Sequence, residues 1–345
     1  MIAVLVGWVG RQDELRKMAK IKVSAPARIH MGILNPTPGI GDRLYASVGV
    51  GIAEPRTVVE VEPADELRVS GPSADECKSF VTRILDYYKL NGAKIDVRLV
   101  PPRHAGLGST TQLSLSIATC ITKAHGLDVR PVELARVLGR GKQSAVGTYA
   151  FQQGGFIVEG GWGDNTTFPP LLLHYDFPED WSFLIVIPES RSFDETQELE
   201  VFEKLPTPQE KLVYEACYRI LLGMTPAVVE KNIRAFGENL TKLQEVVGAM
   251  FSQAQGGVFQ PHSAPLIGKL REMGAIGVGQ SSWGPAVYAL FDPEKRETIE
   301  RVLKEEILYG DSITEPGGTM YGVSEWGEVY FTQADNKGAV IKTVK

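Results

Sequence analysis

The chain has 345 residues, more than one typical hydrophobic core serves, so we expect two domains. Hydrophobic residues make up 43% of it and charged residues 23%, as in ordinary soluble proteins. The formal net charge of -6 and the lack of long lysine or arginine runs argue against a nucleic-acid partner.

Cysteine usage indicates a reducing compartment. Cys77, Cys120 and Cys217 lie far apart without paired spacing, and no cysteine–histidine cluster has the spacing of zinc ligands. We therefore expect a cytoplasmic protein. Residues 1–9 are apolar, but they are much shorter than the ~20 residues of a membrane span and lack the basic start of a signal peptide. They are interpreted as an added strand or as sequence upstream of a true initiator at Met18.

The first half of the chain predicts mixed strands and helices. Alternating or β-branched residues predict strands over 21–25, 48–52, 57–61 and 67–70, and helical spacing predicts a helix over 74–90. Ile95, Val97 and Leu99 alternate with polar residues, which predicts a strand that leads into a glycine-rich stretch at 101–112. A helix then runs to Ala124, another begins at Pro131, and a strand covers 156–158.

The pattern changes near residue 180, where we place a boundary between domains at 1–180 and 181–345. Residues 181–188 form a near-continuous apolar run, typical of a strand buried on both faces. The later predicted elements are helices over 208–222, 226–236, 238–253 and 265–273, a strand over 286–291, a helix from Pro293, and strands over 320–323, 328–332 and 339–344. Because these elements do not alternate strictly, they predict two α+β domains.

The stretch 101–112, Pro-Pro-Arg-His-Ala-Gly-Leu-Gly-Ser-Thr-Thr-Gln, predicts a phosphate site. Gly106 and Gly108 have no Cβ, so the backbone can approach a phosphate closely. Ser109 or Thr110 is expected to cap the following helix, whose first N–H groups attract an anion. Glycine turns are also common plain connections, and neither G-x-x-x-x-G-K-[ST] nor G-x-G-x-x-G is present. The stretch has more hydroxyl side chains than one helix cap needs, which favours the interpretation that some of them contact a ligand.

Two further segments could face the same ligand. Residues 274–285 are rich in glycine and serine and precede a strand; they are either a hairpin device or the second wall of a site between domains. Trp283 either stacks on a ring or packs in the interface. Arg28 can hold phosphate or carboxylate, and His30 can exchange a proton near neutral pH. A surface arginine and a structurally bonded histidine are the plain alternatives.

Arg103 and Arg191 are the other candidate cations. Arg103 lies inside the glycine-rich stretch, where a phosphate contact is reasonable, while its neighbour His104 is equally compatible with a structural role. Arg191 follows the buried strand of the second half and either reaches a cleft between the domains or lies in a solvated loop.

Three segments in this order, Pro26-Ala27-Arg28, 101–112 and 277–285, resemble the three motifs of the GHMP superfamily of galactokinase, homoserine kinase, mevalonate kinase and phosphomevalonate kinase. The resemblance spans residues 21–330. It implies an N-terminal α+β domain with a phosphate loop and a C-terminal ferredoxin-like domain. Mevalonate-kinase-like members carry a catalytic aspartate seven residues before a Gly-Gly pair, where this chain has Gly147, and Arg28 replaces the usual lysine. These two departures weaken the prediction of kinase activity but do not exclude it.

The motifs are more similar to a non-kinase branch, the β-ribofuranosylaminobenzene 5′-phosphate synthases, also called β-ribofuranosylphenol 5′-phosphate synthases. Residues 28–32, 106–112 and 278–285 carry this resemblance together. It implies a phosphoribosyltransferase of archaeal-type tetrahydromethanopterin biosynthesis, which joins phosphoribosyl pyrophosphate to 4-hydroxybenzoate or 4-aminobenzoate and releases pyrophosphate and carbon dioxide. An ATP-dependent small-molecule kinase and a non-catalytic ligand-binding relative are the alternatives.

The resemblance also implies roles for individual residues. The expected catalytic residues are Arg28, His30 and Arg191. The expected phosphate-binding residues are Arg103, Gly106, Leu107, Gly108, Ser109, Thr110 and Gln112. The expected substrate-binding residues are Gly279, Gln280, Ser281, Ser282, Trp283 and Gly284. Mg²⁺ is the expected cofactor, with Ser109 as a ligand. The partners are small-molecule substrates, with neither nucleic acid nor membrane, and a homodimer is one option for the assembly.

Overall fold

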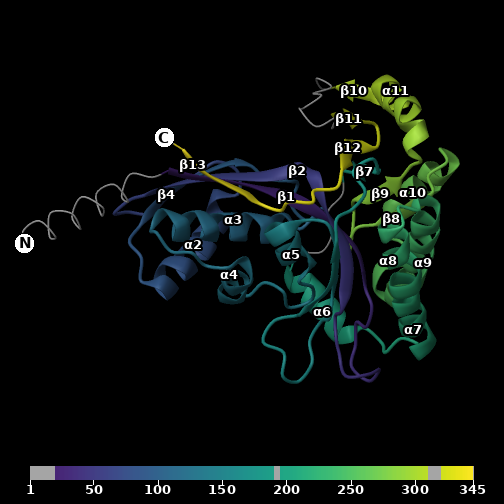
Figure 1. Ribbon diagram of the computed structural model, residues 1–345, viewed down its shortest axis with the longest axis horizontal. Helices are drawn as coiled ribbons and strands as arrows, with labels where there is room; N and C mark the ends of the chain where they lie inside the picture. The colour runs from purple at the N-terminus through teal and green to yellow at the C-terminus, as the bar shows by residue number, and fades with distance from the viewer. Residues whose placement is uncertain (1–19, 190–194, 310–319, 345) are drawn as a thin grey trace, which may run out of the picture.

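The first half of the chain, together with the last strand, forms a seven-stranded sheet with helices packed on one face (Figure 1). The computed structural model describes residues 20–189, 195–309 and 320–344, so residues 1–9, Met18 and Arg191 lie outside the described part. The sheet order is β13-β1-β2-β4-β3, with β5 paired to β2 and β6 to β5. The strands are β1 (Lys20–Ile33), β2 (Ser47–Pro63), β3 (Arg68–Ser70), β4 (Ala93–Leu99), β5 (Phe156–Glu159), β6 (Leu171–Tyr175) and β13 (Val340–Val344).

The strands predicted at 48–52 and 57–61 are parts of the single long strand β2. Its pairing with β1 shifts between Pro26 and Ala27, which oppose Arg56 and Ile52, so the residues of β2 between these two positions bulge out of the ladder. The bulge absorbs Pro55, which has no N–H to donate. β1 consequently continues to Ile33, well beyond its predicted end at residue 25.

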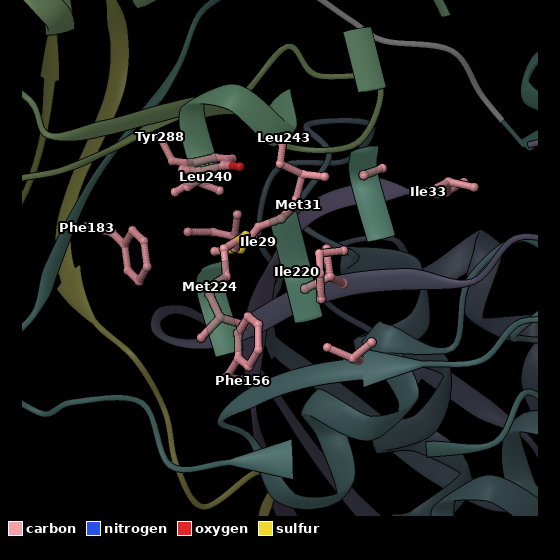
Figure 2. Close-up of a cluster of buried hydrophobic side chains, with 14 of the residues drawn as sticks. Ile29, Met31, Ile33, Phe156, Phe183, Ile220, Met224, Leu240, Leu243 and Tyr288 are labelled. Atoms are coloured by element: carbon pink, nitrogen blue, oxygen red, sulfur yellow. The ribbon is translucent and has the colours of Figure 1, made fainter. Parts of the chain in front are cut away.

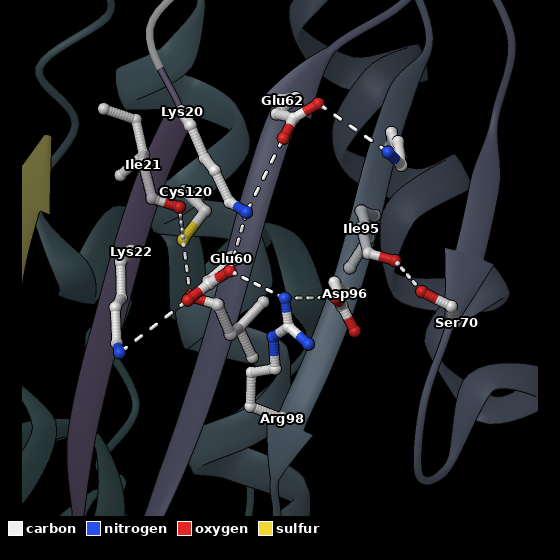
Figure 3. Close-up of polar contacts among 12 residues, drawn as sticks. Lys20, Ile21, Lys22, Glu60, Glu62, Ser70, Ile95, Asp96, Arg98 and Cys120 are labelled. Carbon is white, nitrogen blue, oxygen red and sulfur yellow. Dashed lines mark hydrogen bonds and ion pairs between the residues drawn. The ribbon is translucent and has the colours of Figure 1, made fainter. Parts of the chain in front are cut away.

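The two faces of this sheet differ in chemistry. Helices α2 (Ala74–Tyr88), α3 (Ser109–Ala124), α4 (Pro131–Leu138) and α5 (Val146–Gln153) cover one face (Figure 1). The apolar side chains of α2, such as Val81 and Ile84, enter the core beneath the sheet. Charged side chains occupy the other face, where Glu60 contacts Lys20 at 2.7 Å and Arg98 at 3.2 Å (Figure 3). The helices therefore cover the face of the sheet that carries the apolar side chains.

The second half contains a six-stranded antiparallel sheet of order β10-β11-β12-β7-β9-β8. Its strands are β7 (Ser182–Ile187), β8 (Gly277–Gln280), β9 (Val287–Leu290), β10 (Ile307–Tyr309), β11 (Met320–Ser324) and β12 (Gly327–Gln333). The helical elements are α6 (Glu195–Lys204), α7 (Glu210–Tyr218), the π-helix η1 (Arg219–Met224), α8 (Thr225–Val229), α9 (Ile233–Gln255), α10 (Ser263–Glu272), the 3-10 helix η2 (Pro293–Lys295) and α11 (Arg296–Glu306). Every residue of β7 is buried, as the apolar run predicts.

One hydrophobic core joins the two halves. Figure 2 shows Ile29 and Met31 of β1 among side chains of the second half, including Phe183 of β7 and Leu240 of α9. The stretch Glu210–Val229 has the length and apolar composition of a membrane span, a test that core helices also pass. Its residue Met224 is fully buried in the same cluster (Figure 2).

The last strand departs from the predicted division at residue 180. β13 pairs antiparallel with β1, from Lys20 opposite Val344 to Ser24 opposite Val340. Asp335, just before it, also forms an ion pair with Arg56 of β2 at 2.8 Å. The end of the chain thus belongs to the first sheet, because the free edge of β1 offers unpaired N–H and C=O groups.

Candidate active site

The helix after the glycine-rich stretch begins without a side-chain cap. Gly108 is the N-cap residue, with φ of 76°, and α3 starts at Ser109. The expectation that Ser109 or Thr110 caps the helix is therefore wrong, because the left-handed turn at Gly108 places both residues inside the first helical turn. Their hydroxyls are not used by the cap, and the first N–H groups of α3 have no intrahelical partner. Both features suit an anion.

Three distant segments meet at Gly106. The guanidinium Nη1 of Arg28 and the hydroxyl of Ser281 both donate to the Gly106 carbonyl, the latter at 2.6 Å. The backbone N–H of His30 donates to the same Ser281 hydroxyl at 3.0 Å, and the N–H of Arg28 donates to the carbonyl of Leu107 at 3.2 Å. A Cβ at Gly106 would lie 2.1 Å from the Ser281 carbonyl oxygen. Only glycine fits here.

A cleft with about 1100 Å³ of space between atoms, part of it open to solvent, lies beside this junction. Five groups of residues line the cleft. Four of them are Arg28, His30 and Ile33 of β1; His104, Gly106, Gly108, Ser109, Thr110 and Thr111; Glu198, Leu199 and Phe202 of α6; and Ser282, Trp283 and Gly284. A fifth group, residues 139–144, forms the loop between α4 and α5 and closes the cleft on another side.

The α4–α5 loop brings two cations that the sequence analysis missed. Arg140 and Lys142 line the cleft together with Gln143 and Ser144. The available signal was the alternation of glycine and cation in a glycine-rich block: Arg140 lies between Gly139 and Gly141, and Lys142 follows directly, so the backbone can bring both cations close to an anion. With Arg28, these side chains bring three cations to the cleft, and among the described lining residues one carboxylate, that of Glu198, accompanies them.

His30 is buried, and Arg28 is half-buried with the Nε of its guanidinium enclosed, which determines their charge states. Burial lowers the pKa of Arg28 to about 10, while the nearby carboxylate of Glu198 opposes that shift, so the guanidinium is charged at neutral pH. Burial, and next the charge of Arg28, lower the pKa of His30 to about 3. The expectation that His30 exchanges a proton near neutral pH is therefore wrong for the free protein. Its Nδ1 is buried without a hydrogen-bond partner among the described residues.

A second space, the apolar pocket, adjoins the cleft. It contains about 440 Å³ of space between atoms, part of it open to solvent, and its apolar lining includes Val247, Phe251, Val258 and Phe259. His30, Ile33, Phe202, Ser282 and Trp283 line both spaces. The polar lining of the described pocket consists of neutral groups, chiefly the amides of Gln244, Gln255 and Gln280. The pocket therefore suits an uncharged ring better than a phosphate.

The structure keeps several predicted site residues away from the cleft. Gln112 is fully buried and its Nε2 donates to the Gly147 carbonyl at 2.8 Å, while Leu107 is buried in the interdomain core. Arg103 pairs with Glu76 at 3.1 Å and lines a different surface depression. Gly279 packs beneath the side chains of Tyr288 and Gln244.

The remaining predicted residues reach the site in different ways. Gln280 lines the apolar pocket, and Ser281 holds the glycine-rich stretch against β1. Trp283 is 5% exposed and packs edge-to-face on Phe202 and Phe251, with ring centroids 5.7 Å and 5.0 Å away. Trp283 thus packs between the domains, as one of the two alternatives proposed, and borders both spaces.

The described residues contain no group of three or more His, Cys, Asp or Glu side chains placed to hold a metal ion. Glu198 is the carboxylate that lines the described cleft, and Ser109, Thr110 and Ser144 provide hydroxyls. Mg²⁺ is commonly held by one or two carboxylates together with substrate phosphates. This donor set fits an ion that enters with a phosphate ligand.

Comparisons with known proteins agree with this architecture. Residues 76–155 match the family model of the GHMP kinases N terminal domain, and residues 224–307 match that of the GHMP kinases C terminal. The beta-ribofuranosylphenol 5'-phosphate synthase of Methanothermobacter thermautotrophicus is 33% identical over 324 residues, 87% of this chain and 97% of that protein. The protein of the same name from Archaeoglobus fulgidus is 31% identical over 299 residues, 83% and 92% of the two chains.

A solved structure shows the same fold at low identity. The putative homoserine kinase of Listeria monocytogenes superposes with a TM-score of 0.64 at 15% identity, covering 93% of this chain and 99% of that one.

Proposed function

The chain belongs to the family of the β-ribofuranosylphenol 5′-phosphate synthases, with the two domains of the GHMP kinases, and on this basis we propose that it is a pentosyltransferase acting on phosphoribosyl pyrophosphate. The acceptor is 4-hydroxybenzoate or 4-aminobenzoate, and the products include pyrophosphate and carbon dioxide. The reaction belongs to tetrahydromethanopterin biosynthesis and takes place in the cytoplasm. One observation supports this most: a cationic, glycine-lined cleft lies beside an uncharged pocket and shares five lining residues with it.

The first step is the departure of pyrophosphate from C1 of the ribose. The C–O bond breaks, the electron pair leaves with pyrophosphate, and C1 acquires oxocarbenium character. Arg28, Arg140 and Lys142 line the cleft where this polyanion would lie. The first turn of α3, whose N–H groups have no intrahelical partner, lies at the same cleft. Fixed charges and dipoles of this kind stabilise a leaving group because they need no reorganisation during the reaction.

The second step forms the carbon–carbon bond. The ring carbon that carries the carboxylate attacks C1, the bond from that carbon to the carboxylate breaks, and its electron pair restores the aromatic ring. No side chain has to remove a proton from the ring carbon, since carbon dioxide is the group that leaves. This agrees with the site: the position of the kinase aspartate is Gly147, whose carbonyl is engaged by Gln112.

The aromatic acceptor fits the apolar pocket. Its ring would contact Val247 and Phe251, and its carboxylate-bearing carbon would face the cleft at the shared border. His30 lies at that border, where its neutral imidazole would contact the acceptor. The carboxylate would lie on the side of Arg28, because the described lining of the pocket carries no positive charge.

We propose Mg²⁺ as the cofactor. Ser109, whose hydroxyl the helix cap does not use, and Glu198 both line the cleft and are the proposed oxygen donors to the ion. The ion would neutralise charge on the departing pyrophosphate. Small-molecule substrates are the proposed partners, and a homodimer is the proposed assembly.

The reaction is tested by incubating the protein with phosphoribosyl pyrophosphate, Mg²⁺ and 4-hydroxybenzoate labelled at the carboxyl carbon. We expect labelled carbon dioxide and pyrophosphate in equal amounts, and the same with 4-aminobenzoate. Consumption of ATP with an alcohol acceptor, without carbon dioxide release, would show a kinase instead. Binding of both substrates by calorimetry without any turnover would show a ligand-binding protein.

A further inference from the structure

A buried carboxyl group lies behind the α4–α5 loop, outside the cleft. Glu159 at the end of β5 is 0% exposed. Its Oε2 accepts from the N–H of Gly161 at 2.7 Å, and its Oε1 accepts from the hydroxyl of Ser47 on β2 and, at 3.4 Å, from the N–H of Ala145. Nothing in the proposed reaction uses this group, and a fully buried carboxyl is costly unless it is bonded.

Two serines connect Glu159 to the cleft. The Oγ atoms of Ser47 and Ser144 lie 2.8 Å apart, and Ser144 lines the cleft on the α4–α5 loop. Ser144 Oγ also accepts from the N–H of Val146 at 3.2 Å. Ser47 thus lies between two acceptors, the carboxylate and the Ser144 oxygen, yet a hydroxyl has a single proton to donate. It can satisfy one of them at a time.

The direction of this chain depends on the charge of Glu159. When the carboxyl is ionised, Ser47 donates to it and Ser144 donates to Ser47, so Ser144 presents only a lone pair to the cleft. When the carboxyl is protonated, it donates to Ser47, Ser47 donates to Ser144, and the Ser144 proton points into the cleft. An anion in the cleft accepts a hydrogen bond in the second state and meets a lone pair in the first.

We propose that Glu159, Ser47 and Ser144 form a proton relay that couples anion binding in the cleft to the uptake of one proton by Glu159. The proton comes from the acid form of the buffer through water at the cleft, and the buffer base remains in solution: Ser144 receives the proton and passes its own to Ser47, which passes its own to Glu159. Each hydroxyl gains one proton and loses one, and the chain ends in the orientation that the anion requires. Glu159 is a positioning residue, since it touches no substrate.

The surroundings of Glu159 allow both states near neutral pH. Burial, the largest effect, raises its pKa to about 7, while the bonds from Ser47, Gly161 and Ala145 and the charge of Arg43 oppose the increase. Arg43 donates to the carbonyl of Gly161 at 2.9 Å, so it lies beside the carboxyl without bonding to it. Burial, and next the charge of Glu159, raise the pKa of Tyr149 on α5. The Tyr149 hydroxyl donates to the Pro169 carbonyl at 2.6 Å.

The relay is tested by calorimetry of inorganic sulfate binding, because the charge of sulfate is constant between pH 6 and 9. Titrations in two buffers with different ionisation enthalpies give the number of protons taken up. For the natural protein near pH 7 we expect a sizeable fraction of one proton, and a sulfate Kd that rises above pH 7 by up to about tenfold per pH unit. Glu159→Gln keeps the shape and donates permanently to Ser47, so it should bind without that uptake.

Two further variants and one control keep the test decisive. Ser47→Ala and Ser144→Ala interrupt the chain while Glu159 stays in place, and each should lose the same proton uptake. Glu60→Gln changes a carboxylate of the outer sheet face (Figure 3) and should retain it. Unchanged uptake in all three relay variants, or no sulfate binding by the natural protein, would overturn the relay.

The inference rests on the proposed function only in treating the cleft as the phosphate site. Sulfate binding and proton uptake are measured without turnover. If uptake follows Glu159 but labelled carbon dioxide is never released, the relay stands and the proposed reaction fails; the opposite result removes the relay alone.

Discussion

The hydroxyl of Ser281 donates a 2.6 Å hydrogen bond to the carbonyl of Gly106, 175 residues away in the sequence. The same oxygen accepts from the N–H of His30 at 3.0 Å. One serine of the second domain thus fixes the glycine-rich stretch and the strand that carries Arg28 and His30. The geometry of the cleft therefore depends on the contact between domains as well as on the first domain.

Replacing Ser281 with alanine should reduce activity more than stability. The change removes two hydrogen bonds. The N–H of His30 loses its Ser281 acceptor, while the Gly106 carbonyl keeps the bond from Arg28, and the loss costs about 1–3 kcal/mol of unfolding free energy. Because the Gly106 carbonyl loses its bond to the second domain, kcat/KM for phosphoribosyl pyrophosphate should fall about tenfold or more. Ser324→Ala is the matched control, since its hydroxyl bonds to Gly327 far from the cleft. If the control loses as much activity as Ser281→Ala, the interdomain bond has no special role.

Substitution by alanine should reduce activity strongly at Gly106 and only slightly at Gly147. At Gly106, φ is +81° and the new Cβ would lie 2.1 Å from a backbone oxygen, so the loop has to move. A shift of this size near the reacting groups costs roughly 100-fold in kcat/KM. At Gly147 the new Cβ would lie 3.2 Å from a methyl group of Thr111, in a helix, so turnover should stay within about threefold. Steady-state assays of both variants check this, and a large loss in Gly147→Ala would refute it.

Arg28→Met should abolish most activity while the fold persists. It removes the half-buried cation beside the proposed leaving group and the donor to Gly106, and losing one such group typically costs about 100-fold or more in kcat. Arg98→Met, on the outer face of the first sheet, removes the ion pairs of an exposed arginine with Glu60 and Asp96 and should leave kcat near normal. Circular dichroism establishes folding, and initial rates give the comparison. Near-normal turnover of Arg28→Met would remove Arg28 from the mechanism.

His30 should make the fold less stable in acid. Its pKa is about 3 in the folded protein against 6.5 for a free histidine, so the unfolded chain binds the proton first. Below pH 6.5 this term lowers the free energy of unfolding by up to about 1.4 kcal/mol per pH unit, until the pH approaches 3. His30→Gln removes the term. Urea unfolding at pH 6.5 and 5.0 should therefore show a smaller decrease for the variant, and equal decreases would contradict the burial argument.

Much of the fold could be predicted from local patterns. The strand over Ile95–Leu99, the helix from Ala74 and the doubly buried strand near Phe183 each bury a face that their periodicity indicates. α5 and β6 escaped prediction. α5 spans only Val146–Gln153 between glycine-rich turns, and β6 is a half-exposed strand whose pairing with β5 stabilises it. Packing, rather than sequence period, determines both.

The candidate site was predictable in part. The glycines of the two glycine-rich segments and the cation Arg28 of β1 could be recognised from the composition of the sequence. Arg28, Gly106, Ser282 and Gly284 do line one cleft. The α4–α5 loop was not recognised, because its position over the cleft follows from tertiary contacts of α4 and α5. Gln112 looked like a ligand residue but faces the Gly147 carbonyl, a partner that no spacing rule reveals. Arg103 is likewise drawn away by Glu76.

The pairing of β13 with β1 has a consequence for synthesis on the ribosome. β1 is translated before every other described strand and helix, yet its second neighbour consists of residues 340–344. Until those residues leave the exit tunnel, one edge of β1 from Lys20 to Ser24 has no partner and is open to pairing with other nascent chains. The first domain can therefore nucleate early but completes its sheet only after the whole second domain has been translated.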